Sequence, residues 1–216
     1  MSPDTKNKLK LTFLLLITAL PVTLATISFQ SADENGKVTS TSNKGTLINP
    51  PADISVLDMR DSEGNPAFRS FEDEIATLGE TEEYEIKPWL LVFVTAQQCA
   101  TACEERLHYL QQLHIALGKN IQRVRRYYIN AAAEPLGVET ANMFREDFPS
   151  MGIVYSDATT LENNLREAGA RLSLRDEDYV LLIDPVGNVM MYYSSEQSAE
   201  DIMTDLETLL KYSSLG

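Results

Sequence analysis

The chain has 216 residues, a formal net charge of −14 and only two cysteines. This acidic excess excludes nucleic acid as a partner, because binding to phosphates requires clustered Lys and Arg, and it favours a basic protein surface or a cation instead. The length is right for one domain once an N-terminal targeting segment is set aside.

The N-terminus has the composition of a membrane segment. Lys6, Lys8 and Lys10 precede an uncharged, largely apolar run over residues 11–29, which is just long enough to cross a bilayer. Lysines before the run, with few after it, predict that residues 1–10 are cytoplasmic and that the rest of the chain lies across the membrane. We therefore expect a single-pass signal anchor in a bacterial inner membrane, with the C-terminal domain in the periplasm. A cleaved signal peptide is the alternative.

The remaining chain divides into a tether and one domain. Residues 30–51 are rich in Ser, Thr, Asn and Gly and predict a flexible tether. We expect a compact domain over residues 52–216.

Within this domain, apolar periodicity predicts alternating strands and helices. The expected strands cover 89–95, 124–129, 152–155, 179–184 and 189–193, and the expected helices 104–117, 137–147, 159–168 and 199–212. Residues 185–188, with the sequence Pro-Val-Gly-Asn, join the last two strands as a hairpin. The order β-α-β, an inserted β-α element and then β-β-α predicts an α/β thioredoxin-like sandwich, with a central mixed sheet flanked by helices.

The two cysteines, Cys99 and Cys103, follow the apolar strand over 89–95 directly. A buried strand, a loop and a helix carrying two thiols is the layout of thioredoxin-fold active sites. If Cys99 lies in the loop just before the helix, the two Cα atoms come within disulfide distance. The helix N-terminus would then favour the Cys99 thiolate, which is both a nucleophile and a ligand for soft metals. A purely structural disulfide is the alternative, although so short a loop gives little chain-entropy stabilisation.

Several motifs together resemble the Sco/SenC family. They are the N-terminal anchor, Trp89-Leu-Leu-Val-Phe followed by Cys99-x-x-x-Cys103-Glu-Glu, the strand Tyr127-Tyr-Ile, and Tyr179-Val-Leu-Leu-Ile-Asp-Pro-x-Gly187 before a closing helix. The resemblance covers residues 85–212. It implies a membrane-anchored thioredoxin-fold protein that helps to assemble the copper site of cytochrome c oxidase. Members bind copper through the two cysteines and a histidine and take part in thiol-disulfide exchange, so the implied partners are an oxidase subunit or assembly factor and a thiol-disulfide partner.

The chain departs from the family pattern at three places. Glu104 stands where the family usually has proline, and residues 130–135 replace an Asp-Pro motif. Asp176 stands near the position of the copper-binding histidine, and a carboxylate is a hard ligand that suits Cu(I) poorly.

No other residue replaces that histidine convincingly. His108 and His114 both lie on the helix after Cys103. Helical geometry turns His108 away from the Cys103 face and places His114 too far along the axis to share a metal with the two sulfurs. We expect His114 to be a partly buried packing residue. Met190 and Met191 are soft donors, but they lie in an expected strand where at least one should fill the core.

Three functions follow for Cys99 and Cys103. The first is thiol-disulfide exchange, in which Cys99 is the exposed thiol and Cys103 resolves the mixed disulfide. The second is a Cu(I) chaperone that uses the same two cysteines as metal ligands, with weaker binding than a three-ligand site. The third is a non-catalytic assembly or docking module with a thioredoxin fold.

Overall fold

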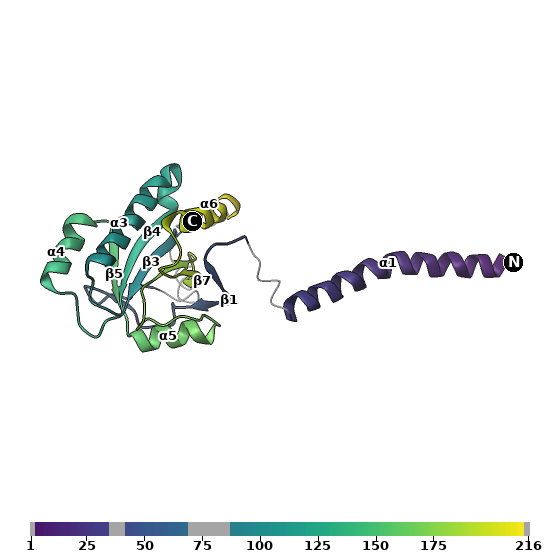
Figure 1. The fold of residues 1–216 in the computed structure, drawn as a ribbon, viewed down its shortest axis with the longest axis horizontal. Coiled ribbons are helices and arrows are strands. Elements are labelled where there is room, and N and C mark those ends of the chain that lie inside the picture. The colour runs from purple at the N-terminus through teal and green to yellow at the C-terminus, as the bar shows by residue number, and fades with distance from the viewer. Residues whose placement is uncertain (1–2, 35–41, 69–86, 214–216) are drawn as a thin grey trace, which may run out of the picture. The chain divides into compact units, whose positions relative to one another are not determined.

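The computed structural model describes residues 3–34, 42–68 and 87–213. The chain forms two compact units, residues 1–43 and residues 44–216, and Figure 1 traces both in colour along the chain. The first unit contains helix α1 (Pro3–Glu34), so the first residues of the expected tether are helical. No helix in the described part of the chain is both long and apolar enough to cross a membrane. The anchor predicted over residues 11–29 is therefore not shown.

The second unit is built on one sheet of seven strands in the order β1-β7-β6-β3-β4-β5-β2. The strands are β1 (Thr46–Asp53), β2 (Arg60–Asp61), β3 (Trp89–Thr95), β4 (Val124–Asn130), β5 (Met151–Tyr155), β6 (Tyr179–Ile183) and β7 (Asn188–Tyr193). β3, β4 and β5 are parallel, whereas β6 and β7 are antiparallel to their neighbours. β3 is central because its side chains are nearly all apolar and both of its faces are covered.

Helices cover both faces of this sheet, as Figure 1 shows. They are α3 (Thr101–Ala116), the short 3₁₀ helix η2 (Gly118–Arg123), α4 (Val138–Asp147), α5 (Ala158–Glu167) and α6 (Ala199–Tyr212). Apolar side chains of α3, α4 and α6 pack on one face, and those of α5 pack on the other. The mixed sheet flanked by helices confirms the predicted thioredoxin-like architecture.

The domain begins earlier than expected, at Lys44 rather than at residue 52. β1 lies inside the predicted tether and pairs antiparallel with β7. The carboxylate of Asp205 in α6 accepts hydrogen bonds from the backbone N–H groups of Lys44 and Gly45 at 2.8–3.0 Å. These contacts fix the start of the domain to its last helix, so the tether cannot extend to residue 51.

One charged side chain of β4, Arg126, is buried with part of its hydrogen-bonding capacity unsatisfied. The Arg126 side chain is 4% exposed, and its Nη2 donates to Ser150 Oγ at 2.7 Å. Its Nε and Nη1 have no hydrogen-bond partner among the described residues, and burial lowers the pKa of the guanidinium. A buried charge with unsatisfied donors costs free energy.

We therefore expect Arg126→Met to raise the free energy of unfolding by about 1–3 kcal/mol, because Met fills similar space without a charge. Urea denaturation of the full-length protein measures this change. The matched control is Arg125→Met, since Arg125 is exposed on the same strand. A loss of stability in Arg126→Met alone would show that the guanidinium contributes more through its contacts than it costs by being buried.

Candidate functional site

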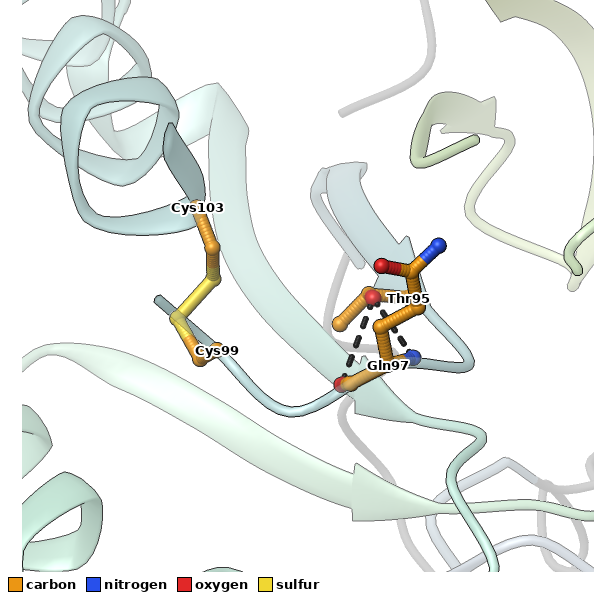
Figure 2. Close-up of a disulfide and its surroundings, with 4 residues drawn as sticks. All are labelled: Thr95, Gln97, Cys99 and Cys103. Atoms are coloured by element: carbon orange, nitrogen blue, oxygen red, sulfur yellow. Dashed lines mark hydrogen bonds between the residues drawn. A yellow bond between two sulfur atoms is a disulfide. The ribbon is translucent and has the colours of Figure 1, made fainter. Parts of the chain in front are cut away.

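The two cysteines meet where β3 ends and α3 begins. They form a disulfide with their Cα atoms 5.2 Å apart, and Figure 2 shows the bond running from the loop to the first turn of the helix. α3 starts at Thr101 with Ala100 as its N-cap. Cys99 therefore lies in the loop just before the helix, as the spacing predicted, and Cys103 lies in the first turn.

The two sulfur-bearing residues differ in accessibility. Cys103 is 4% exposed and packs in the core with leucines of α3 such as Leu107 and Leu110. Cys99 is only partly buried, and it lines a groove of about 340 Å³. An attacking group from solvent therefore reaches Cys99 and not Cys103.

The start of α3 provides a favourable electrostatic environment for a thiolate. The N-cap Ala100 supplies no side-chain hydrogen bond, so the first backbone N–H groups of the helix keep their donors available. These groups and the positive end of the helix dipole stabilise negative charge in the first turn. Glu104, also in the first turn, acts in the opposite direction.

The loop before Cys99 is fixed to the end of β3. Thr95 is 1% exposed, and its hydroxyl accepts a hydrogen bond from the Gln97 N–H at 3.0 Å and donates to the Gln97 carbonyl at 3.4 Å. Figure 2 shows both bonds. Thr95 was not among the residues predicted from the sequence, although it ends the apolar run, which is the signal that could have identified it. Its bonds set the path that leads to Cys99.

An acidic residue, Asp178, lies beside the end of β3 that carries Thr95. Asp178 directly precedes β6, whose first residue, Tyr179, pairs with Val94 of β3. Asp178 Oδ1 is buried and lacks a hydrogen-bond partner in the region that the structure describes. Burial raises the pKa of Asp178, Glu177 raises it further, and the Thr95 hydroxyl acts against the shift. Asp176, the residue of this run that stands near the position of the family histidine, is exposed.

We expect Asp178→Asn to stabilise the domain near neutral pH. Because the pKa of Asp178 is above its ordinary value of 3.8 in the folded state, its destabilising effect is absent below that value and grows as the pH rises through the folded pKa. The gain should be about 1 kcal/mol or less, since solvent screens a group that is only partly buried.

Thermal unfolding of wild type and variant should therefore differ at pH 7 and converge as the pH falls toward about 4. Asp176→Asn is the control, because it removes the same charge from an exposed neighbour. A stability difference that does not depend on pH would show that the ionised Asp178 carboxylate is not the cause of the destabilisation.

The structure places the histidines away from the disulfide. His114 Nε2 lies 2.7 Å from the Val124 carbonyl and 3.1 Å from that of Ile121. Both are acceptors, so Nε2 carries the proton and donates. The expected partial burial of His114 is confirmed, and these hydrogen bonds hold its ring. His108 is exposed, and its ring packs against Phe148 with centroids 4.8 Å apart.

The other soft donors also have structural roles. Met191 is 6% exposed, and both Met190 and Met191 pack with the core under α3 and α6, as expected for strand residues. Across the described ranges, no group of three or more His, Cys, Asp or Glu residues is arranged to hold a metal ion. Two thiolates from Cys99 and Cys103 suit Cu(I) in their softness, but the sulfurs are available to a metal only after the disulfide is reduced.

Comparison with solved structures gives low similarities. The copper-bound ScoI of Arabidopsis thaliana is 13% identical, with 59% of this chain and 87% of that chain covered and a TM-score of 0.45. BsSco, described as a member of the Sco family of cytochrome c oxidase assembly proteins, is 16% identical, with 76% and 96% covered and a TM-score of 0.49. A thiol:disulfide interchange protein from Bacteroides sp. is 16% identical, with 79% and 91% covered and a TM-score of 0.46. Likeness at this level assigns no activity to the chain.

No curated protein matches the chain. A family model does match it, the one for the transmembrane-like, thioredoxin-like, C-terminal domain, over residues 89–213. The matched range contains the cysteine pair, every strand of the sheet from β3 to β7, and α6. It is more than half of the 216 residues. The chain therefore belongs to the family of transmembrane-like, thioredoxin-like C-terminal domains.

Proposed function

We propose that this protein exchanges thiols and disulfides with a partner protein through Cys99 and Cys103. The observation that carries the proposal is the unequal accessibility of the pair. Cys99 lines an open groove, whereas Cys103 is 4% exposed behind it. This is the arrangement that exchange requires, with one sulfur open to attack and the other held ready to leave or to resolve.

In the disulfide form, the chain acts as the oxidant. A client thiolate attacks Cys99 Sγ, the Cys99–Cys103 bond breaks, and its electron pair leaves on Cys103 as a thiolate in the first turn of α3. A second client thiolate then attacks the client sulfur of the mixed disulfide, and Cys99 leaves as a thiolate that takes a proton from solvent. The client loses two electrons and gains a disulfide, and once Cys103 also takes a proton from solvent the pair is a dithiol. The reverse sequence reduces a client disulfide.

A purely structural role explains the disulfide less well. The bonded cysteines are only four residues apart, so the bond removes little conformational entropy from the unfolded chain. The loop that leads to Cys99 is also fixed at Gln97 by the hydrogen bonds of Thr95. The disulfide is therefore expected to add little to the stability of this loop.

We further propose that the exchange serves the assembly of cytochrome c oxidase at a bacterial inner membrane, with residues 11–29 as the anchor and the domain in the periplasm. The support is the Sco/SenC-like pattern around Cys99, Cys103 and the strand that ends at Asp184, together with the lysines that precede the apolar run. An oxidising compartment also suits a redox-active pair.

The test is the redox behaviour of the pair in the full-length protein. In buffers of reduced and oxidised glutathione, the dithiol and disulfide should interconvert reversibly within the potential range of those buffers, which alkylation and mass spectrometry would quantify. A disulfide that stays intact below about −300 mV would instead be structural.

A Cu(I) competition titration of the reduced protein tests the chaperone alternative. We expect the protein to lose Cu(I) to a strong chelator, because only two thiolates are present. Binding that survives the chelator, and that vanishes in a Cys99→Ala, Cys103→Ala control, would favour copper transfer over exchange.

A further inference from the structure

The groove beside Cys99 has two walls from distant parts of the sequence. One wall is the loop of Gln97, Gln98 and Cys99, and the other is the segment from Asn130 to Thr140 that connects β4 to α4. The groove encloses about 340 Å³. That volume is enough for a few side chains of an extended segment, so a chain lying in it would pass beside Cys99.

The second wall is held rigidly against the sheet. Asn130 is 2% exposed, its Nδ2 donates to the Glu134 carbonyl at 3.1 Å, and its Oδ1 accepts from the Ala132 N–H at 3.1 Å. The Ala131 N–H donates to the Thr95 carbonyl at 2.8 Å. The segment that connects β4 to α4 is thus hydrogen-bonded to Thr95, the residue that fixes the loop before Cys99. A preformed groove loses less conformational entropy on binding than a mobile one.

The lining combines apolar surface with negative charge. Pro135, Leu136 and Val138 supply the apolar part, and Val138 is 80% exposed. Glu134 and Glu139, both exposed, are the charged residues among the described residues of the lining, which include no Lys or Arg.

The start of α3, beside the disulfide, is also acidic. Glu104 and Glu105 are exposed in the first two turns of α3, and the whole chain carries a net charge of −14. A cationic segment would therefore be attracted to this face, and an anionic one repelled.

We propose that this groove binds the client segment that flanks the reactive cysteine, and that it selects segments with Lys or Arg beside that cysteine. The inference rests on the proposed function and adds its substrate class, a basic cysteine-containing peptide segment. Glu134 and Glu139 pair with the flanking cations, and the apolar lining receives the aliphatic stems of the same side chains. Binding places the client sulfur against Cys99, where the exchange already described takes place.

The test compares three peptides, each as a mixed disulfide with glutathione, in which the single cysteine is flanked by Lys, by Ser or by Glu. The reduced full-length protein attacks each one, and glutathione release gives the second-order rate constant. Dividing by the rate constant of each peptide with dithiothreitol removes the effect of flanking charge on the disulfide itself. We expect the Lys peptide to react about fivefold to tenfold faster than the Glu peptide at low ionic strength, with the ratio falling as salt is added.

Charge-neutral variants assign the preference to the groove. In Glu134→Gln/Glu139→Gln, the ratio should fall to about twofold or less. Glu146→Gln is the matched control, because Glu146 is exposed on the same helix α4 but does not line the groove, and it should keep the full ratio. Equal rates for all three peptides, or a preference unchanged in the double variant, would overturn the inference alone. Failure of every disulfide to react would overturn the proposed function and this inference with it.

Discussion

Replacement of Cys103 by Ser is expected to trap the partner on Cys99. In the reduced variant, the Cys99 thiolate attacks a disulfide and forms a mixed disulfide, but no second thiol is present to release it. The covalent adduct should accumulate stoichiometrically, and mass spectrometry after acid quenching would detect it. The reason is geometric, since Cys99 lines the groove while the residue at position 103 is buried.

The reciprocal variant, Cys99→Ser, is the control for this assignment. Its remaining thiol, Cys103, is 4% exposed and reacts only when the start of α3 opens. A local opening that costs about 3 kcal/mol slows the reaction by about 100-fold. A chromogenic aromatic disulfide gives both rates from the released thiolate. Equal rates for the two variants would contradict the assignment of Cys99 as the attacking thiol. Full function of the Cys99→Ala, Cys103→Ala variant in oxidase assembly would favour a docking module.

The largest effect on stability is expected from Asp205→Ala. The Asp205 carboxylate is 6% exposed and accepts from the N–H groups of Lys44 and Gly45 at 2.8–3.0 Å and from the Tyr193 hydroxyl at 3.2 Å. Burial, with the nearby Asp205 charge, also raises the pKa of Tyr193, so this hydroxyl remains a donor at ordinary pH. Removal of the Asp205 carboxylate leaves three donors unsatisfied. The free energy of unfolding, measured by urea denaturation, should therefore fall by about 3–5 kcal/mol.

Two further variants show whether the loss comes from these hydrogen bonds. Asp205→Asn keeps one acceptor oxygen and should lose less stability than Asp205→Ala, while Glu207→Ala removes an exposed carboxylate from the same helix and should change stability by no more than about 0.5 kcal/mol. In Asp205→Ala, limited proteolysis should also cut more readily near Lys44, because β1 loses its connection to α6. Equal stability of Asp205→Ala and wild type would show that these bonds contribute nothing net.

Local sequence pattern was sufficient to predict most of the helices and strands. Apolar periodicity placed the strands from β3 to β7 and the helices from α3 to α6 within a few residues of their observed bounds. These elements are long or strongly patterned, and each buries a face of its own, so a short window of sequence carries the signal. The same was true of the hairpin between β6 and β7, where Gly187 has φ +103° and Asp184 accepts from the Val186 and Asn188 N–H groups.

β1 could not be recognised in this way, because its structure depends on a distant partner. Only Ile48 and Ala52 of its eight residues are buried, and it contains two consecutive prolines, Pro50 and Pro51, which are tolerated on an edge strand but are not typical of one. Pairing with β7 and the bonds from Lys44 to Asp205, 161 residues away, create the strand. A polar stretch with prolines therefore predicted a tether where the tertiary structure forms a sheet edge.

The sequence by itself determined which residues could do chemistry. The chain has two cysteines and two histidines, and helical spacing already separated His108 and His114 from the thiols. Only the tertiary structure decided how the thiols differ, because the packing of α3 on the sheet buries Cys103 while the Thr95 and Asn130 hydrogen bonds shape the groove that reaches Cys99. Accessibility and charge around a site arise from contacts between segments far apart in the chain, and no local pattern in the sequence records those contacts.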